Sequence, residues 1–322
     1  MRRLAIGGAA ALFLIALSTN GLAKPPKGIA KSPIPLTNCE TITKRGNYVL
    51  ENDLVLTLIY SGGQGGTGNC LVIDSSHVNV DLNGRTITTA CVLPDGLPFC
   101  PPIVQGGIGI DIEADHVSIA NGQVGEVNGG FVYGVVGGAD HISATNLGIT
   151  TDIGIVLSDV SHSAFTNIVY EGADTQIHSE NGPVLSVSGG GGNTFTSINS
   201  KSNTFEGIII TNSSNNVIEG ADIFCTAQQE AGPGILLTQE SSHNHIINND
   251  IFVLFGNGIE LDLGSDGNVI QNNTVETATT PPGFFALFDQ NSDCGLNIWT
   301  DNVFSNEFAP AQISASPANC IH

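Results

Sequence analysis

The sequence predicts an all-β solenoid, in which a short unit of strands and turns repeats and stacks on itself. One observation is a polar residue that returns at intervals of 21 to 39 residues, and another is a set of strand patterns that open with Gly-Ile. Repeats of about 20–50 residues are typical of solenoids, and these units lack helical periodicity. An unbroken repeat favours one domain whose stability is summed over neighbouring coils.

The polar repeat is clearest in the C-terminal half, where Asn precedes apolar residues, as in NVIEGADI from Asn216 and NVIQNNTV from Asn268. In the N-terminal half we align a His that follows Ser or Asp with this Asn. Asn favours turns, and like side chains on stacked strands can bond to one another along the stack. We therefore predict one continuous structural ladder. Its rungs are His77, His116, His141, His162, Asn193, Asn216, Asn244, Asn268 and Asn297.

The strand patterns come before most of these rungs. They are GIDIE at Gly109, GIVLS at Gly154, GIIIT at Gly207, GILLT at Gly234 and GIELD at Gly258. Alternating apolar residues with β-branched enrichment predict half-buried strands. Each unit is thus a strand, a turn with the rung, a second strand and a loop.

These repeats resemble the right-handed parallel β-helix proteins of the pectin-lyase-like superfamily. The segment CLVIDSSHVNVDLNGRTIT, residues 70–88, is similar to the first coil of secreted members. The resemblance spans residues 39–310 and implies a single-stranded right-handed parallel β-helix of roughly nine or ten coils. It implies no particular chemistry, because one fold carries many functions. The paired-Asp, Gly-His-Gly and Asp-Pro-His motifs of its enzymes are not found here.

The N-terminus has the pattern of a secretory signal peptide. Arg2 and Arg3 precede the apolar run 4–17, and small residues follow up to Ala23. We predict a signal peptide over residues 1–23, an extended linker over 24–38, and the β-helix with its two caps over 39–322. A membrane anchor is the alternative reading of the apolar run. We expect no membrane span after cleavage, and a secreted, periplasmic or extracellular protein.

Seven cysteines fit an oxidising compartment, where disulfides persist. We predict that one disulfide ties the N-terminal cap to the first coil, one closes a loop, and one closes the C-terminal end. The predicted pairs are Cys39–Cys70, Cys91–Cys100 and Cys294–Cys320, although spacing alone does not prove a connectivity. Cys225 is left over, and we expect it to be buried.

The acidic charge of the chain limits the classes of partner that it can bind. The formal net charge is −21, and no Lys or Arg follows Lys201, whereas 14 Asp and Glu do. Nucleic acid needs a basic surface, so it is not an expected partner. Direct binding of polyuronates is disfavoured as well, since it would need a bridging cation such as calcium. We expect a polysaccharide or a surface partner protein.

Glu260 and Asp262 are the candidate catalytic pair, because alternation places both on the outer face of one strand. Residues two apart on a strand are about 6.6 Å apart, within the range of glycosidase carboxyl pairs. Calcium is an alternative reading, because stacked carboxylates offer it oxygen ligands. A solvated acidic face is a third. The candidate calcium ligands are Asp262, Asp266, Asp289 and Asp293, and no other cofactor is indicated.

Asp111 and Glu113 form a second acidic pair in an early coil, and we predict outward apolar residues between the two pairs. Together they are candidate ligand-binding positions: Asp111, Glu113, Val156, Ile209 and Leu236. Such a strip could contact a sugar face or a protein, or lie under loops. Transition-metal binding by the four His is disfavoured, because Asn, a poor ligand, fills the same predicted rung.

The sequence leaves two functions open. Long insertions recur at one junction of the repeat, at 88–108, 125–133, 224–233 and 276–283, and stacked loops can wall a binding face. That favours an exported protein that binds or cleaves an extracellular polysaccharide, as a hydrolase or lyase if it is an enzyme. The few aromatic residues and the absence of a basic groove favour the alternative, a non-catalytic surface or adhesin-like protein.

Overall fold

The computed structural model describes most of the chain from residue 32 onwards. The described residues are 32–59, 68–92, 107–126, 131–172, 182–200, 206–226, 232–278, 284–292, 294–306, 314–315 and 321. The predicted signal peptide, and the predicted linker up to residue 31, lie outside them. Within the described part of the chain, no helix is long and apolar enough to cross a membrane.

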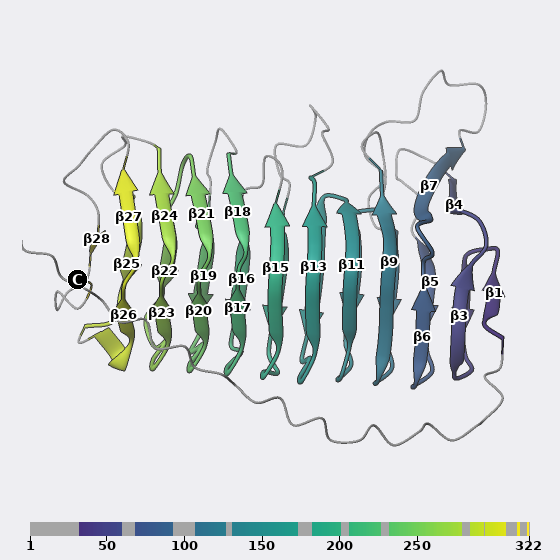
Figure 1. The fold of residues 1–322 in the computed structure, drawn as a ribbon, viewed down its shortest axis with the longest axis horizontal. Coiled ribbons are helices and arrows are strands. Elements are labelled where there is room, and N and C mark those ends of the chain that lie inside the picture. The colour runs from purple at the N-terminus through teal and green to yellow at the C-terminus, as the bar shows by residue number, and fades with distance from the viewer. Residues whose placement is uncertain are drawn as a thin grey trace, which may run out of the picture. The chain divides into compact units, whose positions relative to one another are not determined.

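Two parallel sheets run along the stack of coils, and each strand pairs with the equivalent strand of the next coil (Figure 1). Sheet B has eleven strands: β2 (Glu40–Ile42), β5 (Gly68–Ile73), β8 (Gly107–Ile112), β10 (Tyr133–Gly137), β12 (Ile153–Ser158), β14 (Leu185–Ser188), β16 (Ile208–Thr211), β19 (Ile235–Thr238), β22 (Ile259–Leu261), β25 (Leu287–Asp289) and β28 (Ser314–Ala315).

Sheet A has seventeen strands, because many coils contribute two. They are β1 (Ile34–Leu36), β3 (Gly46–Leu50), β4 (Leu54–Ile59), β6 (Val78–Asp81), β7 (Thr86–Val92), β9 (Val117–Gly125), β11 (Ser143–Thr150), β13 (Ala164–Tyr170), β15 (Thr194–Ser200), β17 (Val217–Glu219), β18 (Asp222–Cys225), β20 (His245–Ile247), β21 (Asp250–Val253), β23 (Val269–Gln271), β24 (Thr274–Thr277), β26 (Ile298–Thr300) and β27 (Val303–Asn306). One 3₁₀ turn, η2 (Cys294–Leu296), precedes β26.

The predicted parallel β-helix is confirmed, with two differences in extent. Sheet B has eleven strands rather than nine or ten, because the short strands β2 and β28 at the two ends lack the Gly-Ile pattern. The first strand, β1, lies inside the segment predicted as linker. It pairs with β3, so residues 34–36 belong to the first coil.

The core follows from the alternation that predicted the strands. Inward residues of successive coils stack on like residues, as Ile110, Val135 and Ile155 do on sheet B. Gly109, Gly154, Gly207, Gly234 and Gly258 also face inward, and a Cβ on any of them would meet neighbouring atoms closer than 3.0 Å. The Gly that opens each strand pattern is therefore needed for close approach of the coils.

The prediction of a single ladder is wrong in the N-terminal half, where the residue in line with the Asn ladder comes one position after each histidine. The amide of Ser163, not of His162, donates to Asn193 Oδ1, at 3.0 Å. Val78, Val117 and Ile142 hold this inward position in the earlier coils. The histidines stand one residue earlier, at positive φ between 55° and 60°, where the side chain points outward. His and Asn both tolerate the left-handed region, which explains why their turns look alike in sequence.

The inward Asn ladder itself is confirmed from Asn193 to Asn297. The backbone N–H and Nδ2 of Asn244 both donate to Asn268 Oδ1, at 2.8 and 3.2 Å. Asn268 donates in the same way to Asn297 Oδ1, at 2.8 and 3.1 Å. Asn244 and Asn268 are fully buried, so the ladder supplies the hydrogen bonds that buried polar groups require.

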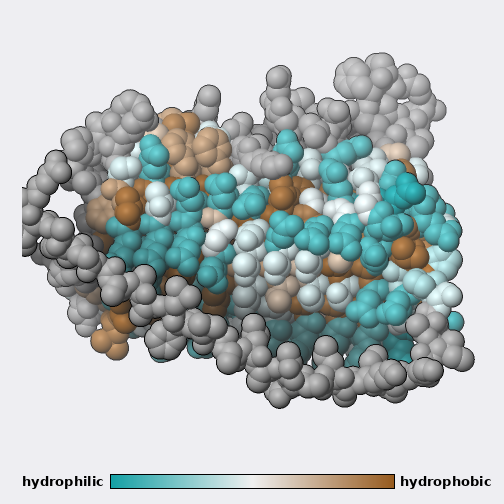
Figure 2. All heavy atoms as spheres, in the orientation of Figure 1, coloured by the Kyte–Doolittle hydropathy of each residue, from teal (hydrophilic) through white to brown (hydrophobic). Residues whose placement is uncertain are grey.

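A second inward ladder, formed by Asn249, Asn273 and Asn302, was not predicted. Asn249 Nδ2 donates to Asn273 Oδ1 at 2.9 Å, and Asn273 Nδ2 donates to Asn302 Oδ1 at the same distance. Outward Asn residues stack too: Asn146 Nδ2 donates to Asn121 Oδ1 at 3.1 Å. Figure 2 shows one face of the coils, where hydrophilic side chains form rows across successive strands.

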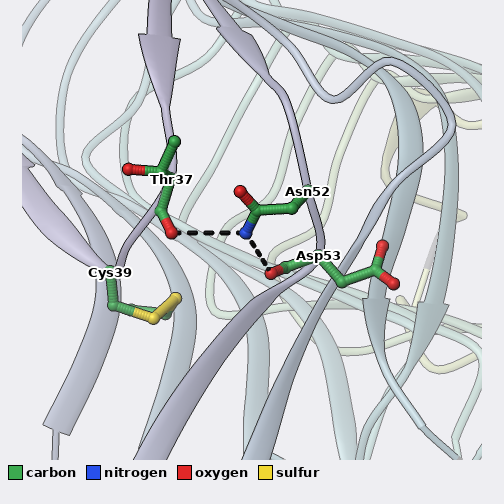
Figure 3. The surroundings of a disulfide bond; sticks show 5 residues. Thr37, Cys39, Asn52 and Asp53 are labelled. Atoms are coloured by element: carbon green, nitrogen blue, oxygen red, sulfur yellow. Dashed lines mark hydrogen bonds between the residues drawn. A yellow bond between two sulfur atoms is a disulfide. The ribbon is translucent and has the colours of Figure 1, made fainter.

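The predicted disulfide between Cys39 and Cys70 is present and links β2 to β5, since the Cys39 turn leads directly into β2. Beside it, Asn52 Nδ2 donates to the carbonyl oxygens of Thr37 and Asp53, at 3.2 and 2.7 Å (Figure 3). Cys294 is also disulfide-bonded, but Cys320 and Cys100 lie outside the described residues, so the other two predicted pairs stay predictions. Cys225 is buried, as expected.

Candidate functional site

The outer face of sheet B carries the candidate residues in two columns. One column contains Asp111, Val136, Val156, Ser186, Ile209, Leu236, Glu260 and Phe288, each paired with the next. Asp262 stands one outward position further along the chain, directly after β22. Both predicted acidic pairs therefore lie on one face, but in coils far apart along the stack.

Glu260 and Asp262 form a cluster with the side chains of three neighbours. Gln290 Nε2 donates to Glu260 Oε1 at 2.8 Å and to Asp262 Oδ1 at 2.9 Å. Asn257 Nδ2 donates to Glu260 Oε2 at 2.8 Å, and Thr238 Oγ1 donates to Asp262 Oδ2 at 2.6 Å. All four carboxylate oxygens thus accept a hydrogen bond, so both side chains are held in place while remaining half-buried.

An aromatic pair adjoins this cluster. Phe288 is the neighbour of Glu260 on the next strand, and its ring stacks on that of Phe285 with centroids 5.2 Å apart. The amide of Phe285 donates to Asn257 Oδ1 at 2.7 Å, which connects the pair to the polar cluster. Both rings are half-buried, so apolar surface and hydrogen-bonding groups meet at one place.

Asp289, a predicted calcium ligand, does not lie in this cluster. It pairs with Leu261 rather than Asp262 and is fully buried. Its carboxylate accepts hydrogen bonds from Asn291, from Asn297 Nδ2 and from Trp299 Nε1. Four N–H groups therefore donate to this carboxylate, two of them to each oxygen.

The remaining predicted calcium ligands do not converge either. Asp266 is exposed in the turn before β23, and Asp293 lies outside the described residues. Among the described residues, no group of three or more His, Cys, Asp or Glu is arranged to hold a metal ion. Of the predicted ligands that the structure describes, Asp262 alone lies in the polar cluster, where it accepts hydrogen bonds from Gln290 and Thr238.

The predicted apolar strip is interrupted. Ser186 of β14 lies between Val156 and Ile209, and this strand escapes the Gly-Ile pattern because Val184 holds the position of Gly154. The strip is thus two short patches, one of Val136 and Val156 and one of Ile209 and Leu236. The loops predicted to wall this face fall largely on residues outside the described part of the chain, including 93–106 and 279–283.

Asp111 is held differently from the C-terminal cluster. Asn69 Nδ2 donates to its Oδ2 at 2.6 Å, and Val72 and Val136 flank it in the column. Burial raises the pKa of Asp111 above its ordinary value, and the nearby Glu113 raises it further. Glu113 itself is exposed, so this pair is less enclosed than the pair in the C-terminal coils.

The raised pKa of Asp111 gives a testable pH dependence. We expect a carbon-13 NMR titration to place it above the ordinary value of about 3.9. Glu113→Gln should lower it while leaving it raised, because burial is the larger cause. The folded state then binds this proton more tightly than the unfolded state. Its contribution to stability is fully present below the ordinary pKa and is lost as the pH rises through the folded-state pKa. A value at or below the ordinary one would contradict this account.

Sequence reasoning missed Gln290, Asn257, Thr238 and the aromatic pair. The signal was present in the strand pattern, because Ala286 occupies the position of Gly258 in the next coil. Counting from Ala286 places Phe288 beside Glu260 and Gln290 beside Asp262.

Comparisons with solved structures give low similarity. A periplasmic alginate epimerase is 12% identical, with 78% of this chain and 68% of that chain covered and a TM-score of 0.42. An alginate lyase from Paenibacillus sp. str. FPU-7 is 13% identical, with 87% and 99% covered and a TM-score of 0.45. The enzymatically active domain of tailspike protein 2 of bacteriophage CBA120 is 16% identical, with 86% and 41% covered and a TM-score of 0.45.

Similarity at this level carries no information on substrate or reaction, and this chain spans less than half of the tailspike domain. No curated protein sequence matches the chain. A family model described as a right handed beta helix region matches residues 134–321, more than half of the chain. The protein therefore belongs to the right-handed β-helix family.

Proposed function

We propose that this protein binds a polysaccharide on the outer face of sheet B, across β19, β22 and β25. The observation that carries the proposal is the polar cluster around Glu260 and Asp262 beside the stacked rings of Phe285 and Phe288. A sugar presents hydroxyl groups that carboxylates and amides can bond, and apolar C–H faces that can lie on an aromatic ring. Binding sites typically combine apolar surface with a few placed polar groups.

The charge of this region favours a neutral polysaccharide. Both carboxylates accept hydrogen bonds on every oxygen, and no Lys or Arg follows Lys201 in the sequence. A polyuronate would bring further carboxylates to an acidic face and would need a bridging cation. Neutral hydroxyls need only exchange hydrogen bonds with Gln290 and Asn257.

Cleavage is a second candidate, supported by the spacing of the carboxylates. Glu260 Oε1 and Asp262 Oδ1 share one Gln290 nitrogen at 2.8 and 2.9 Å, so these two oxygens lie at most 5.7 Å apart. That is nearer to the roughly 5–5.5 Å of retaining glycosidases than to the 6.5–9.5 Å of inverting ones. A glycosidase also needs a carboxylic acid that donates a proton. Both groups act here as acceptors, which favours binding over cleavage.

Export is part of the proposal. The signal-like N-terminus and the Cys39–Cys70 disulfide both fit an oxidising compartment outside the cytosol. A non-catalytic surface protein that recognises a glycan through this face would have the same features.

The test is polysaccharide binding by variants of the aromatic and polar halves of the site. Phe288→Ala and Gln290→Ala should each weaken binding to a neutral polysaccharide about tenfold, which corresponds to the loss of ~1.4 kcal/mol per contact. Val136→Ala, in the same column on β10, is the matched control and should leave affinity unchanged. Binding would be measured by calorimetry across a panel of neutral and acidic polysaccharides.

Reducing-end release on the same panel separates the two candidates. Release that disappears in Glu260→Gln and in Asp262→Asn would establish cleavage, and retention of anomeric configuration should accompany it. Binding without release would establish the glycan-binding function. Folded protein that binds no polysaccharide, or binding that is lost equally in Val136→Ala, would refute the proposed site.

A further inference from the structure

Four exposed imidazoles form a continuous stack on the turns that lead into β6, β9, β11 and β13. The rings belong to His77, His116, His141 and His162. Successive ring centroids are 4.9, 4.5 and 5.5 Å apart, and successive ring planes differ by 7°, 5° and 16°. These turns lie along the lower edge of Figure 1. The stack is far from the cluster around Glu260 along the series of coils.

The turn does not require histidine. The equivalent positions in the next coils are held by Gly192, Asn215, His243 and Gly267, all at positive φ. The backbone therefore needs only a residue that tolerates the left-handed region. The fold would therefore tolerate other residues at these four positions, and it does not by itself explain why four successive coils carry histidine.

We propose that adjacent pairs of this histidine stack bind a divalent transition-metal ion such as Zn²⁺. Metal–nitrogen distances are about 2.0–2.1 Å, so two nitrogens on one ion lie at most about 4.2 Å apart. An imidazole binds a metal in the plane of its ring. The parallel rings of His116 and His141, with centroids 4.5 Å apart, must therefore rotate out of the stack until one nitrogen of each points at the same ion. Both side chains are exposed and can rotate without disturbing the core.

The ring nitrogens are available for a metal. Within the described residues, none of the four imidazoles makes a side-chain hydrogen bond. Neutral imidazole is a common ligand of zinc and copper. The inward Asn ladder occupies a different stack from the four histidines, and Asn215, which does share their column, lies two coils beyond His162.

Carboxylates next to the stack add negative charge. Asp115 precedes His116, and Asp140 precedes His141. Asp115 Oδ1 accepts the N–H of Asp140 at 2.9 Å, and Asp140 Oδ1 accepts the N–H of Ser161 at 2.7 Å. These bonds fix the carboxylates beside the rings without placing three ligands at one point. Two imidazoles with water at the other positions suit zinc, copper or nickel better than calcium or magnesium, which prefer oxygen ligands.

The first test is calorimetric titration of the purified protein with Zn²⁺. His116→Asn/His141→Asn breaks every adjacent pair in the stack and should weaken binding about tenfold or more, since losing only an outer-shell partner already costs 10–100-fold. Asn occurs at this turn position at Asn215, so the variant should fold, which circular dichroism would verify. His243→Asn/His245→Asn removes two exposed histidines outside the stack and should bind like wild type.

The second readout is electron paramagnetic resonance with Cu²⁺. Nitrogen couplings from imidazole are expected in wild type and should be lost in His116→Asn/His141→Asn. Three outcomes would overturn the proposal: no Zn²⁺ binding to wild type, equal binding to the stack variant, or a spectrum with oxygen ligands alone. A spectrum with oxygen ligands alone would mean that the metal binds to surface carboxylates and not to the histidine stack.

Discussion

Asp289→Ala is expected to lower the free energy of unfolding by about 3 kcal/mol or more. The carboxylate is fully buried, and its removal leaves Trp299 Nε1 and the backbone N–H of Asn291 without an acceptor. It also removes one of the acceptors of Asn297 Nδ2 and of Asn291 Nδ2. Each buried group left unsatisfied costs about 1–3 kcal/mol. Urea unfolding followed by circular dichroism would measure the change from the shift of the midpoint.

The matched control is Asp250→Ala, an exposed aspartate on β21, for which a change within about 0.5 kcal/mol is expected. The loss in Asp289→Ala should be the same with calcium and with chelator, because N–H donors and not an ion surround the carboxylate. If the substitution lowered the free energy of unfolding only in the presence of calcium, Asp289 would be a calcium ligand. A variant as stable as the control would show that the bonds to Trp299 and Asn297 contribute little.

Asn268→Ala is expected to destabilise the protein by a similar amount, about 3 kcal/mol. Its side chain accepts from the N–H and Nδ2 of Asn244 and donates to Asn297 Oδ1 and to the carbonyl of Ser241. Truncation therefore breaks the ladder between two coils and leaves several buried groups unpaired. In a solenoid each coil contacts only its neighbours, so the damage falls on the interface of these coils.

Asn79→Ala supplies the comparison for this substitution. Asn79 is exposed on β6, and within the described part of the chain its side chain bonds only to Asn47, at 2.8 Å, so its loss should cost less than about 0.5 kcal/mol. Hydrogen exchange adds a local measurement, because amides of β20, β23 and β26 should lose protection before those of β6 and β9. Equal stability of the two variants would mean that the inward ladder is not needed to hold the coils together.

The candidate glycan site depends on the same interfaces. Gln290 follows Asp289 directly, and Asp289 is anchored to Trp299 and Asn297 in the next part of the coil. Asp289→Ala should therefore weaken polysaccharide binding indirectly, by releasing Gln290 from its position between Glu260 and Asp262. The histidine stack is carried by other coils, so its Zn²⁺ affinity should be unaffected by that change.

The fold could be predicted from the sequence, because a parallel β-helix repeats one local pattern in every coil. The apolar alternation after Gly109, Gly154 and Gly258 marks inward and outward residues in every coil, and the close approach of coils requires Gly at these positions. The disulfide between Cys39 and Cys70, predicted as a tie between the N-terminal cap and the first coil, is also present.

The register of the side chains could not be predicted from the sequence, because it depends on how the coils pack on one another. A shift of one residue turns a side chain from one face of a strand to the other, and two predictions failed by one residue. His162 proved to be outward while Ser163 was inward, and Asp289 proved to be inward while Gln290 stood beside Asp262. The sequence could name the polar residues of each turn, but packing between coils decided which of them faced the core and which could meet a ligand.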